Sequence, residues 1–379
     1  MDEATRRLPV SQPHITVDDK AAVLACLDNN FLSGDSPIVG EFEKKFASLI
    51  GRQHGIAVAN GSVALDLVLH AMDLGVDDEV ILPSFTIASC LFAVLRTGAT
   101  PVLVDVDAET WNMSIETVLP KVTHKTKAIM IVHIYGLPVD LDPIRNLCSE
   151  KGIALIEDAA EAHGVRYKGV LCGSFGLAST FSFYANKAIT TGEGGMVLTD
   201  DQAFNDRIRY FRNLAFAPPP GKRFIHTEMG WNYRLASMQA ALGESQILRM
   251  DEIVNEKRSI GLKYFNLLSS HPLIEMQPTE TDYSQNMYWV VGVLLHDSLD
   301  SDAIAGALRS RGVDTRPFFF PLHRQPLLSD FGLADQEQLK VSERLGRQGI
   351  YLPSYLGITD DDIAYAASQL VDVISESAS

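Results

Sequence analysis

The stretch Ala154-Leu155-Ile156-Glu157-Asp158-Ala159-Ala160-Glu161-Ala162-His163-Gly164 joins an apolar run directly to acidic residues and a histidine. The run is apolar without alternation, which is typical of a strand covered by helices on both faces. In open α/β sheets, ligands bind at the carboxyl ends of the strands. We therefore expect Asp158 at the ligand-binding edge of a sheet, although an acidic residue in this position could equally cap the following turn.

Similar apolar runs recur along the first two thirds of the chain. They are Gly55–Ala59, Glu79–Leu82, Pro101–Val106, Ala128–His133, Ile153–Ile156, Thr180–Tyr184 and Met196–Thr199. Helical patterns separate the earlier runs, at Ser62–Met72, Ala88–Arg96 and Pro143–Lys151. Alternating strands and helices predict an α/β fold with a mostly parallel seven-stranded sheet and helices on both sides.

The pattern changes after about residue 245. A helix-like stretch, Leu242–Leu268, is followed by an expected strand (Tyr288–Leu295), helix (Ser301–Arg311), strand (Val313–Phe318) and two terminal helices. We predict a large α/β domain with an N-terminal arm over residues 1–245 and a smaller α+β domain over residues 246–379. The stretch Pro218-Pro219-Pro220-Gly221 predicts a surface loop of the large domain.

Composition excludes several classes of function. The 379 residues include 32 basic and 48 acidic side chains, a net charge of −16, which argues against nonspecific binding to nucleic acid or to an anionic membrane. No stretch reaches the roughly 18 apolar residues that a membrane span needs. The four cysteines are scattered, which favours neither disulfides nor a metal site and suits a reducing cytoplasm. They are Cys26, Cys90, Cys148 and Cys172.

A lysine follows the end of another expected strand. Lys187 comes shortly after Thr180–Tyr184 and before the glycine-rich run Gly192-Glu193-Gly194-Gly195. A neutral lysine forms imines with aldehydes, and a partly desolvated position favours the neutral state. A carboxylate such as Asp158 can keep a pyridine nitrogen protonated, as pyridoxal 5′-phosphate (PLP) chemistry requires. Alone, Lys187 could be an ordinary surface lysine; together the two residues indicate a PLP site.

Two further motifs fit such a site. Asn60-Gly61-Ser62 lies where a strand passes into a helix, and the free amides of a helix N-terminus bind phosphate well. The same residues could simply cap the helix. The polar and aromatic group Met229–Arg234 precedes another expected helix and could equally serve packing. The sequence contains no HExxH, CxxC, P-loop or G-x-S-x-G motif.

Taken together, these motifs resemble the sugar-nucleotide aminotransferases of the DegT/DnrJ/EryC1/StrS family over nearly the whole chain. The resemblance implies PLP-dependent transferase fold type I, the fold of aspartate aminotransferase. The motifs that carry it are Asn60–Ser62, Val132–Gly136, Ile156–Gly164, Asn186-Lys187, Thr191–Met196 and Trp231–Arg234.

The resemblance also implies roles for individual residues. Lys187 would form the imine with the cofactor and carry the proton during catalysis. Asp158 would pair with the pyridine nitrogen, and Glu161 stands where the family often has glutamine, near the phenolic oxygen. The phosphate cup would consist of Gly61, Ser62 and Ser182.

Two positions bear on the assembly and on the cofactor ring. Asn232 matches a family asparagine that reaches the phosphate of the neighbouring subunit, so the resemblance implies a homodimer. Many relatives stack an aromatic residue on the cofactor ring after Pro83-Ser84-Phe85-Thr86, but this chain has Ile87 there. Either Ile87 covers the ring or Phe85 does.

Within the family, the likeness is strongest to enzymes that aminate GDP-4-keto-6-deoxy-D-mannose at C4 for surface polysaccharide, with L-glutamate as amino donor. It rests on Glu157–Gly164 and on Thr315–His323. Expected substrate contacts are His163, Arg316, Phe318 and His323. Alternatives are a dTDP- or UDP-linked 4-keto sugar, a PLP enzyme that decarboxylates or cleaves an amino acid, and a non-catalytic sensor of PLP or a sugar nucleotide.

Overall fold

The computed structural model describes residues 6–216, 223–333 and 337–377. Its larger part is built on a seven-stranded sheet with the strand order β1-β9-β8-β5-β4-β2-β3. The strands are β1 His54–Val58, β2 Glu79–Pro83, β3 Thr100–Val104, β4 Thr126–Val132, β5 Ala154–Asp158, β8 Ala178–Ser182 and β9 Gly195–Thr199. Strand β9 runs opposite to the other six strands of this sheet, which are parallel to one another. The prediction of a mostly parallel sheet from seven apolar runs is confirmed; the predicted loop Pro218–Gly221 lies outside the described residues.

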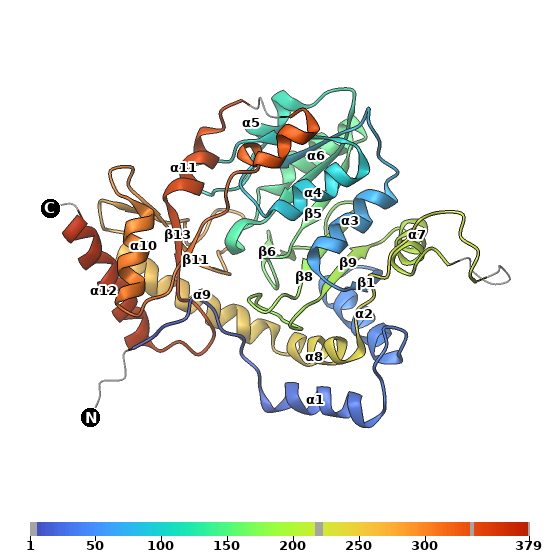
Figure 1. The fold of residues 1–379 in the computed structure, drawn as a ribbon, viewed down its shortest axis with the longest axis horizontal. Coiled ribbons are helices and arrows are strands. Elements are labelled where there is room, and N and C mark those ends of the chain that lie inside the picture. The colour runs from blue at the N-terminus through green and yellow to red at the C-terminus, as the bar shows by residue number, and fades with distance from the viewer. Residues whose placement is uncertain (1–5, 217–222, 334–336, 378–379) are drawn as a thin grey trace.

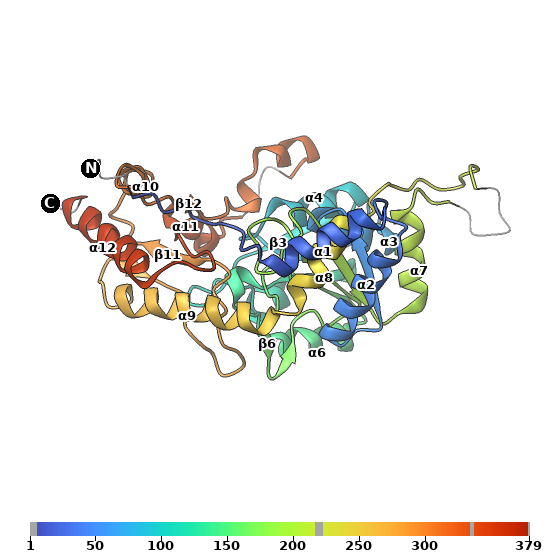
Figure 2. The same ribbon diagram turned by 90° about the horizontal axis from the view of Figure 1, so that it is seen from below.

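Helices cover both faces of this sheet (Figures 1 and 2). The helices of this larger part are α1 Val17–Asp28, which packs on α8, and α2 Pro37–Ile50, α3 Gly61–Ala71, α4 Ala88–Thr97, α5 Ile115–Val118, α6 Leu141–Lys151, α7 Gln202–Arg212 and α8 Ser237–Ile247. Side chains alternate along β8, so Phe181 and Ser182 point to opposite faces. Phe46 of α2 packs edge-on against Phe181, whereas Gly61 of α3 lies against Ser182. Helices α2 and α3 therefore cover opposite faces of the sheet.

A second, four-stranded antiparallel sheet forms the core of the C-terminal part. Its order is β10 Ile274–Glu275, β11 Val291–Leu295, β13 Gly349–Leu352 and β12 Arg316–Pro317. The accompanying helices are α9 Met250–Leu268, α10 Ser301–Ser310, α11 Lys340–Gln348 and α12 Asp360–Ser377. A separate hairpin pairs β6 Arg166–Tyr167 with β7 Val170–Leu171. The expected strand Val313–Phe318 shortens to β12, and β10 and β13 were not expected.

One predicted helix is wrong. The stretch Leu242–Leu268 forms two helices, α8 and α9, separated at Leu248 and Arg249. Arg249 leaves helical geometry (φ −111°, ψ 14°), and its guanidinium bonds to the buried carboxylate of Asp19 in α1 at 2.9 Å. The helical periodicity continues through the break, so the sequence pattern does not reveal it.

The two parts of the molecule share elements. The first half of α9 packs in the hydrophobic core of the large sheet through Ile253, and its second half packs with the small sheet through Tyr264. The start of the N-terminal arm, which was expected with the large domain, pairs with the small part: Leu8 N–H donates to Gly312 O at 2.8 Å. Helix α1, farther along the arm, packs on α8 of the large part. The predicted boundary at residue 245 thus falls just before a helix that both parts use. None of the helices in the described ranges has both the length and the apolar character needed to cross a bilayer.

Candidate active site

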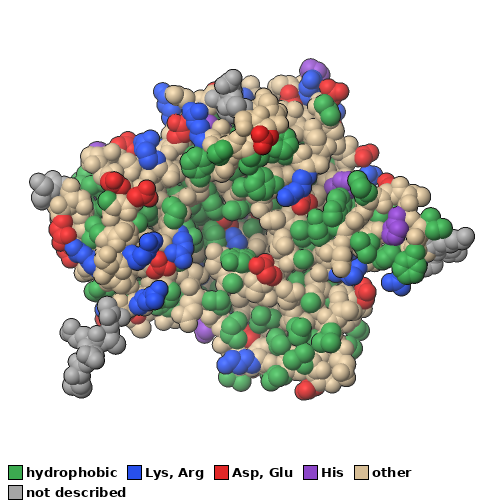
Figure 3. Space-filling view, viewed as in Figure 1, with side chains coloured by type: hydrophobic (Ala, Val, Ile, Leu, Met, Phe, Trp, Pro, Cys, Tyr) green, Lys and Arg blue, Asp and Glu red, His purple; other side chains and the backbone are tan. Residues whose placement is uncertain are grey.

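A cavity of about 730 Å³ lies at the carboxyl ends of β4, β5 and β8, where residues of the small part meet the large sheet. Figure 3 shows this face of the molecule hollowed near its centre. Val132, Asp158 and Thr180 stand side by side in the strand register, so their side chains share one face of the sheet. All three line the cavity, as expected for the ligand-binding edge of a parallel sheet.

The Asp158 carboxylate is buried, and its hydrogen bonds offset only part of the free energy lost when it leaves water. It accepts hydrogen bonds from the Cys90 thiol at 3.3 Å and from Ala160 N–H at 3.0 Å. Burial raises the pKa of Asp158, and the bond from Ala160 opposes this only in part. A positively charged group in the cavity would stabilise the ionised carboxylate.

Lys187 points its ammonium at a second acidic side chain. Its Nζ lies 3.5 Å from Glu161 Oε1 and 3.5 Å from the centre of the Trp289 ring. Burial lowers the pKa of Lys187, and burial raises the pKa of Glu161 to about 7 although Lys187 acts against that rise. Both shifts favour neutral forms, and a neutral lysine is the nucleophile that imine formation needs.

The N-terminus of α3 borders the same cavity. Asn60 caps the helix by accepting from Val63 N–H at 3.0 Å, and the Ser62 hydroxyl bonds to the Ser89 hydroxyl at 2.6 Å. A Cβ atom on Gly61 would come within 2.7 Å of Ser182 Cβ, so glycine permits the close approach of α3 to the end of β8. The expected cup residues Gly61, Ser62 and Ser182 are thus together at one end of the cavity.

This arrangement fits PLP. The helix N-terminus suits the phosphate, the buried carboxylate of Asp158 suits a protonated ring nitrogen, and Lys187 suits the aldehyde. In addition, the buried Thr180 hydroxyl lines the cavity without a hydrogen-bond partner in the described part of the chain. An unpaired buried hydroxyl is costly, so a ligand that bonds to it is favoured.

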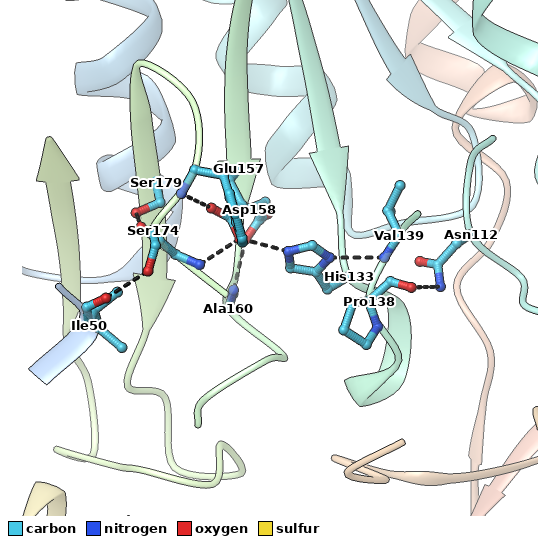
Figure 4. A network of polar contacts seen from close by, with 12 residues as sticks. Ile50, Asn112, His133, Pro138, Val139, Glu157, Asp158, Ala160, Ser174 and Ser179 are labelled. Carbon is cyan, nitrogen blue, oxygen red and sulfur yellow. Dashed lines mark hydrogen bonds and ion pairs between the residues drawn. The ribbon is translucent and has the colours of Figure 1, made fainter. Parts of the chain in front are cut away.

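Behind the cavity, a polar network joins the strand ends (Figure 4). His133 Nδ1 accepts from Val139 N–H at 3.1 Å, so Nε2 carries the proton and donates to Glu157 Oε1 at 2.8 Å. Glu157 also accepts from the backbone N–H groups of Gly173 and Phe175. The sulfur of Cys172 lies close to this pair. Because both ring nitrogens and both carboxylate oxygens already have partners, the network serves as a structural tie rather than a set of free metal ligands.

None of the four expected substrate contacts lines the main cavity, and three of them are buried elsewhere. His163 packs between Phe181 and Phe183 on the opposite face of the sheet, and burial lowers its pKa to about 3. Phe318 is buried against Trp111 and Tyr135. His323 is buried between the Ser84 hydroxyl, 2.6 Å from Nδ1, and Glu343, 3.0 Å from Nε2. The sequence pattern did not reveal on which face each side chain lies.

The remaining expected residues occupy three different surroundings. Arg316 lines a smaller cavity of about 270 Å³, and Lys187 lines both this cavity and the main one. The guanidinium of Arg316 forms an ion pair with Asp314 at 2.9 Å. Asn232 is exposed and pairs with Asn213, the residue that follows α7. Of the two residues considered for covering the cofactor ring, Ile87 lines the main cavity. Phe85 is buried in an aromatic cluster with Tyr135 and does not line it.

The sequence did not predict the residues of the small part that line the main cavity. Trp289, Phe319 and Tyr351 all line the cavity. Each lies more than 100 residues beyond Lys187 in the sequence. Phe319 belongs to the stretch Thr315–His323 that carried the family likeness, but its neighbour Phe318 was the expected contact. Trp289 and Tyr351 belong to no motif with a chemical meaning of its own, and their aromatic character suits core packing equally well.

Comparison with known proteins gives concordant matches. The model of the DegT/DnrJ/EryC1/StrS aminotransferase family matches residues 13–371. A curated relative from Escherichia coli O157:H7, named GDP-perosamine synthase, is 37% identical over 97% of this chain and 99% of its own. One of the same name from Vibrio cholerae is 35% identical over 94% of this chain and 96% of its own. The solved aminotransferase TlmJ from Streptoalloteichus hindustanus superimposes with a TM-score of 0.91 at 29% identity, covering 98% of this chain and 100% of its own.

Proposed function

The chain belongs to the DegT/DnrJ/EryC1/StrS aminotransferase family, and we propose that it transfers the amino group of L-glutamate to the C4 ketone of GDP-4-keto-6-deoxy-D-mannose, forming GDP-perosamine. Its cofactor is PLP. The observation that carries the aminotransferase assignment is the meeting of Lys187, Asp158 and the N-terminus of α3 around one cavity. The choice of substrate is supported by relatives named GDP-perosamine synthase that match over almost their full length.

Four parts of the chain would hold the cofactor. Gly61 and Ser62 at the start of α3, with Ser182, would bind the phosphate, and Asp158 would bond to the ring nitrogen. Ile87 would cover one face of the ring. When bound, PLP supplies an aldehyde that exchanges its oxygen for the amino group and a ring that accepts the electron pair left on the carbon that loses its proton.

The chain's own groups would then move the proton. Asp158 keeps the ring nitrogen protonated by opposite-charge pairing. The Lys187 amine accepts one proton from the donor carbon and returns one proton when the second substrate is aminated. Glu161, with its pKa near 7, can pair with the lysine when that side chain is protonated. Trp289, Phe319 and Tyr351 would restrict the access of water to these groups.

We extend the proposal to the assembly and its setting. A homodimer is supported by the exposed position of Asn232 beside the end of α7, from which its amide could reach the phosphate of a neighbouring subunit. The enzyme would work in the cytoplasm and supply an amino sugar nucleotide for surface polysaccharide.

The test follows the two half-reactions separately. The holoenzyme is treated with L-glutamate, freed of excess donor and then given GDP-4-keto-6-deoxy-D-mannose while the absorption spectrum of the cofactor is recorded. We expect 2-oxoglutarate in the first step and return of the starting spectrum in the second, with neither in Lys187→Ala. Return of the spectrum only with a dTDP- or UDP-linked 4-keto sugar would leave the reaction class intact and change the substrate. If no 2-oxoglutarate appears with wild type, the assignment as an aminotransferase fails.

A further inference from the structure

Two groups enclose the end of the Lys187 side chain. Glu161 Oε1 lies 3.5 Å from Nζ, and the face of the Trp289 ring is centred 3.5 Å from the same atom. Both side chains are buried. A carboxylate attracts the ammonium, and the face of an indole attracts it by a cation–π interaction that is strongest where water is excluded. The two groups belong to different parts of the molecule, because Trp289 precedes strand β11 of the small sheet.

Both groups are held by one residue. Tyr135 N–H donates to Glu161 Oε2 at 2.9 Å, and Tyr135 C=O accepts from Trp289 N–H at 2.8 Å. The indole itself donates from Nε1 to Asn186 C=O at 2.9 Å, next to Lys187 in the chain. Tyr135 is fully buried in the left-handed region (φ 58°, ψ 17°), a conformation that a tyrosine adopts only when its surroundings impose it.

We propose that Trp289 and Glu161 form the resting place of the Lys187 ammonium during the half of the catalytic cycle in which this lysine is not bonded to the cofactor. This inference rests on the proposed function and adds Trp289 to it as a positioning residue that acts through Lys187. A lysine side chain has four flexible methylene groups, so a freed ammonium explores many positions. The indole face attracts the charge through its π electrons and has no lone pair that would hold one N–H of the ammonium in a fixed direction. The N–H groups therefore stay available to the cavity, and the lysine stays close to the carbon whose proton it carries.

The experiment compares Trp289→Phe, which keeps an aromatic face, with Trp289→Leu, which keeps apolar volume alone. Trp111→Leu is the matched control, since Trp111 is a buried indole that contacts the same Tyr135 ring. The measurement is the single-turnover rate of the holoenzyme with L-glutamate and with L-glutamate deuterated at Cα. We expect Trp289→Leu to be roughly ten- to thirtyfold slower, the effect of losing a desolvated cation–π contact, with a larger deuterium isotope effect. Trp289→Phe should recover most of the rate.

A second readout does not depend on turnover. In the cofactor-free protein, the rate at which an amine-specific acylating reagent modifies Lys187 is followed by peptide mass spectrometry. Loss of the indole both uncovers the amine and removes stabilisation from its protonated form, so modification should be several-fold faster in Trp289→Leu than in wild type. Trp289→Phe and Trp111→Leu should stay close to wild type. Trp289→Met provides a further non-aromatic variant if Trp289→Leu does not fold.

Equal isotope effects and equal modification rates in Trp289→Leu and Trp111→Leu would overturn the proposal. That outcome differs from failure of the proposed function, in which wild type itself forms no 2-oxoglutarate from glutamate. The modification rates remain informative in that case, because they report the contact between Lys187 and Trp289 directly.

Discussion

Asp158 and His163 lie five residues apart, yet they have opposite environments. Asp158 is on the cavity face of the sheet, in register with Thr180. His163 lies on the other face, against Phe181 and Phe183. The sequence pattern placed Asp158 at the ligand-binding edge, and the family likeness added His163 as a substrate contact, but the turn after β5 directs the histidine into the core. The buried, uncharged imidazole of His163 therefore contributes to the stability of the fold and not to ligand binding.

The buried state of His163 predicts a dependence of stability on pH. Burial lowers its pKa from 6.5 to about 3, so its contribution is fully present above pH 6.5 and is lost as the pH falls toward 3. Between pH 8 and pH 5 this one group should remove about 2 kcal/mol of unfolding free energy. Urea unfolding of cofactor-free wild type and His163→Phe at both pH values measures it, and the variant should lack that loss.

Exposed His124 offers the control. His124→Gln should keep the full difference between pH 8 and pH 5. An unchanged difference in His163→Phe would show that the imidazole is charged in the folded protein and that the assignment of His163 to the core is incorrect.

At the scale of elements, the seven strands of the large sheet were predictable because each contains a short apolar run and helical patterns separate the earlier runs. Helices α1 and α2 were not predicted. Helix α1 has little amphipathic pattern, and leucines such as Leu24 and Leu27 are exposed on it. What holds α1 in place is a tertiary contact: Asp19, fully buried, receives bonds from Ser245 at 2.7 Å and from Arg249 at 2.9 Å.

The contact between α1 and the break after α8 predicts a large effect of Asp19→Ala. The substitution leaves Arg249, Ser245 and Gln246 with unmatched polar groups near the core. Removal of one partner of a buried ion pair typically costs about 3 kcal/mol or more. Urea unfolding should show a loss of about 3 kcal/mol, and limited proteolysis should cut within residues 17–28 faster than in wild type.

Asp18→Ala is the matched control, because Asp18 lies in the same first turn of α1 but is exposed. Its effect should stay within about 0.5 kcal/mol. A similar small effect for Asp19→Ala would mean that α1 is held by its apolar contacts and not by this carboxylate.

At the scale of the whole molecule, the large and small parts meet at two left-handed turns. Gly136 (φ 98°) packs against the backbone that enters β11, and its C=O accepts from Met287 N–H at 3.0 Å. A Cβ atom on Gly136 would lie 2.8 Å from Trp289 N and 3.0 Å from Tyr288 N. Tyr288 is itself in the left-handed region (φ 56°). This contact positions Trp289 beside Lys187, so the geometry of the cavity depends on how the two parts fit.

Gly136→Ala should therefore damage the site as well as the fold. We expect a loss of about 2 kcal/mol in unfolding free energy from backbone strain and the close contact. We also expect a glutamate half-reaction slowed at least roughly tenfold, because displaced catalytic groups lose rate steeply. Urea unfolding and single-turnover spectroscopy measure the two effects.

Gly152→Ala is the control that separates the effect of backbone strain from the effect of the close contact made by an added Cβ atom. Gly152 has φ 67°, but a Cβ atom there would meet no other atom within 4 Å. It should lose stability from backbone strain and keep the rate of the half-reaction. If Gly136→Ala also keeps that rate, the fit of the two parts at this turn does not control the cavity.

The sequence by itself determined the order of strands and helices in the large sheet, the strand ends that carry Asp158 and Ser182, and the presence of Lys187 and a helix N-terminus beside them. These features are local, because apolar runs and turn residues act over a few neighbours along the chain. Only the tertiary structure decided that Trp289, Phe319 and Tyr351 complete the cavity, and that the expected contacts lie outside it. These contacts are His163, Arg316, Phe318 and His323. The physical reason is that packing between distant segments selects the face on which a side chain lies, and no periodicity in the sequence encodes which distant segment will cover that face.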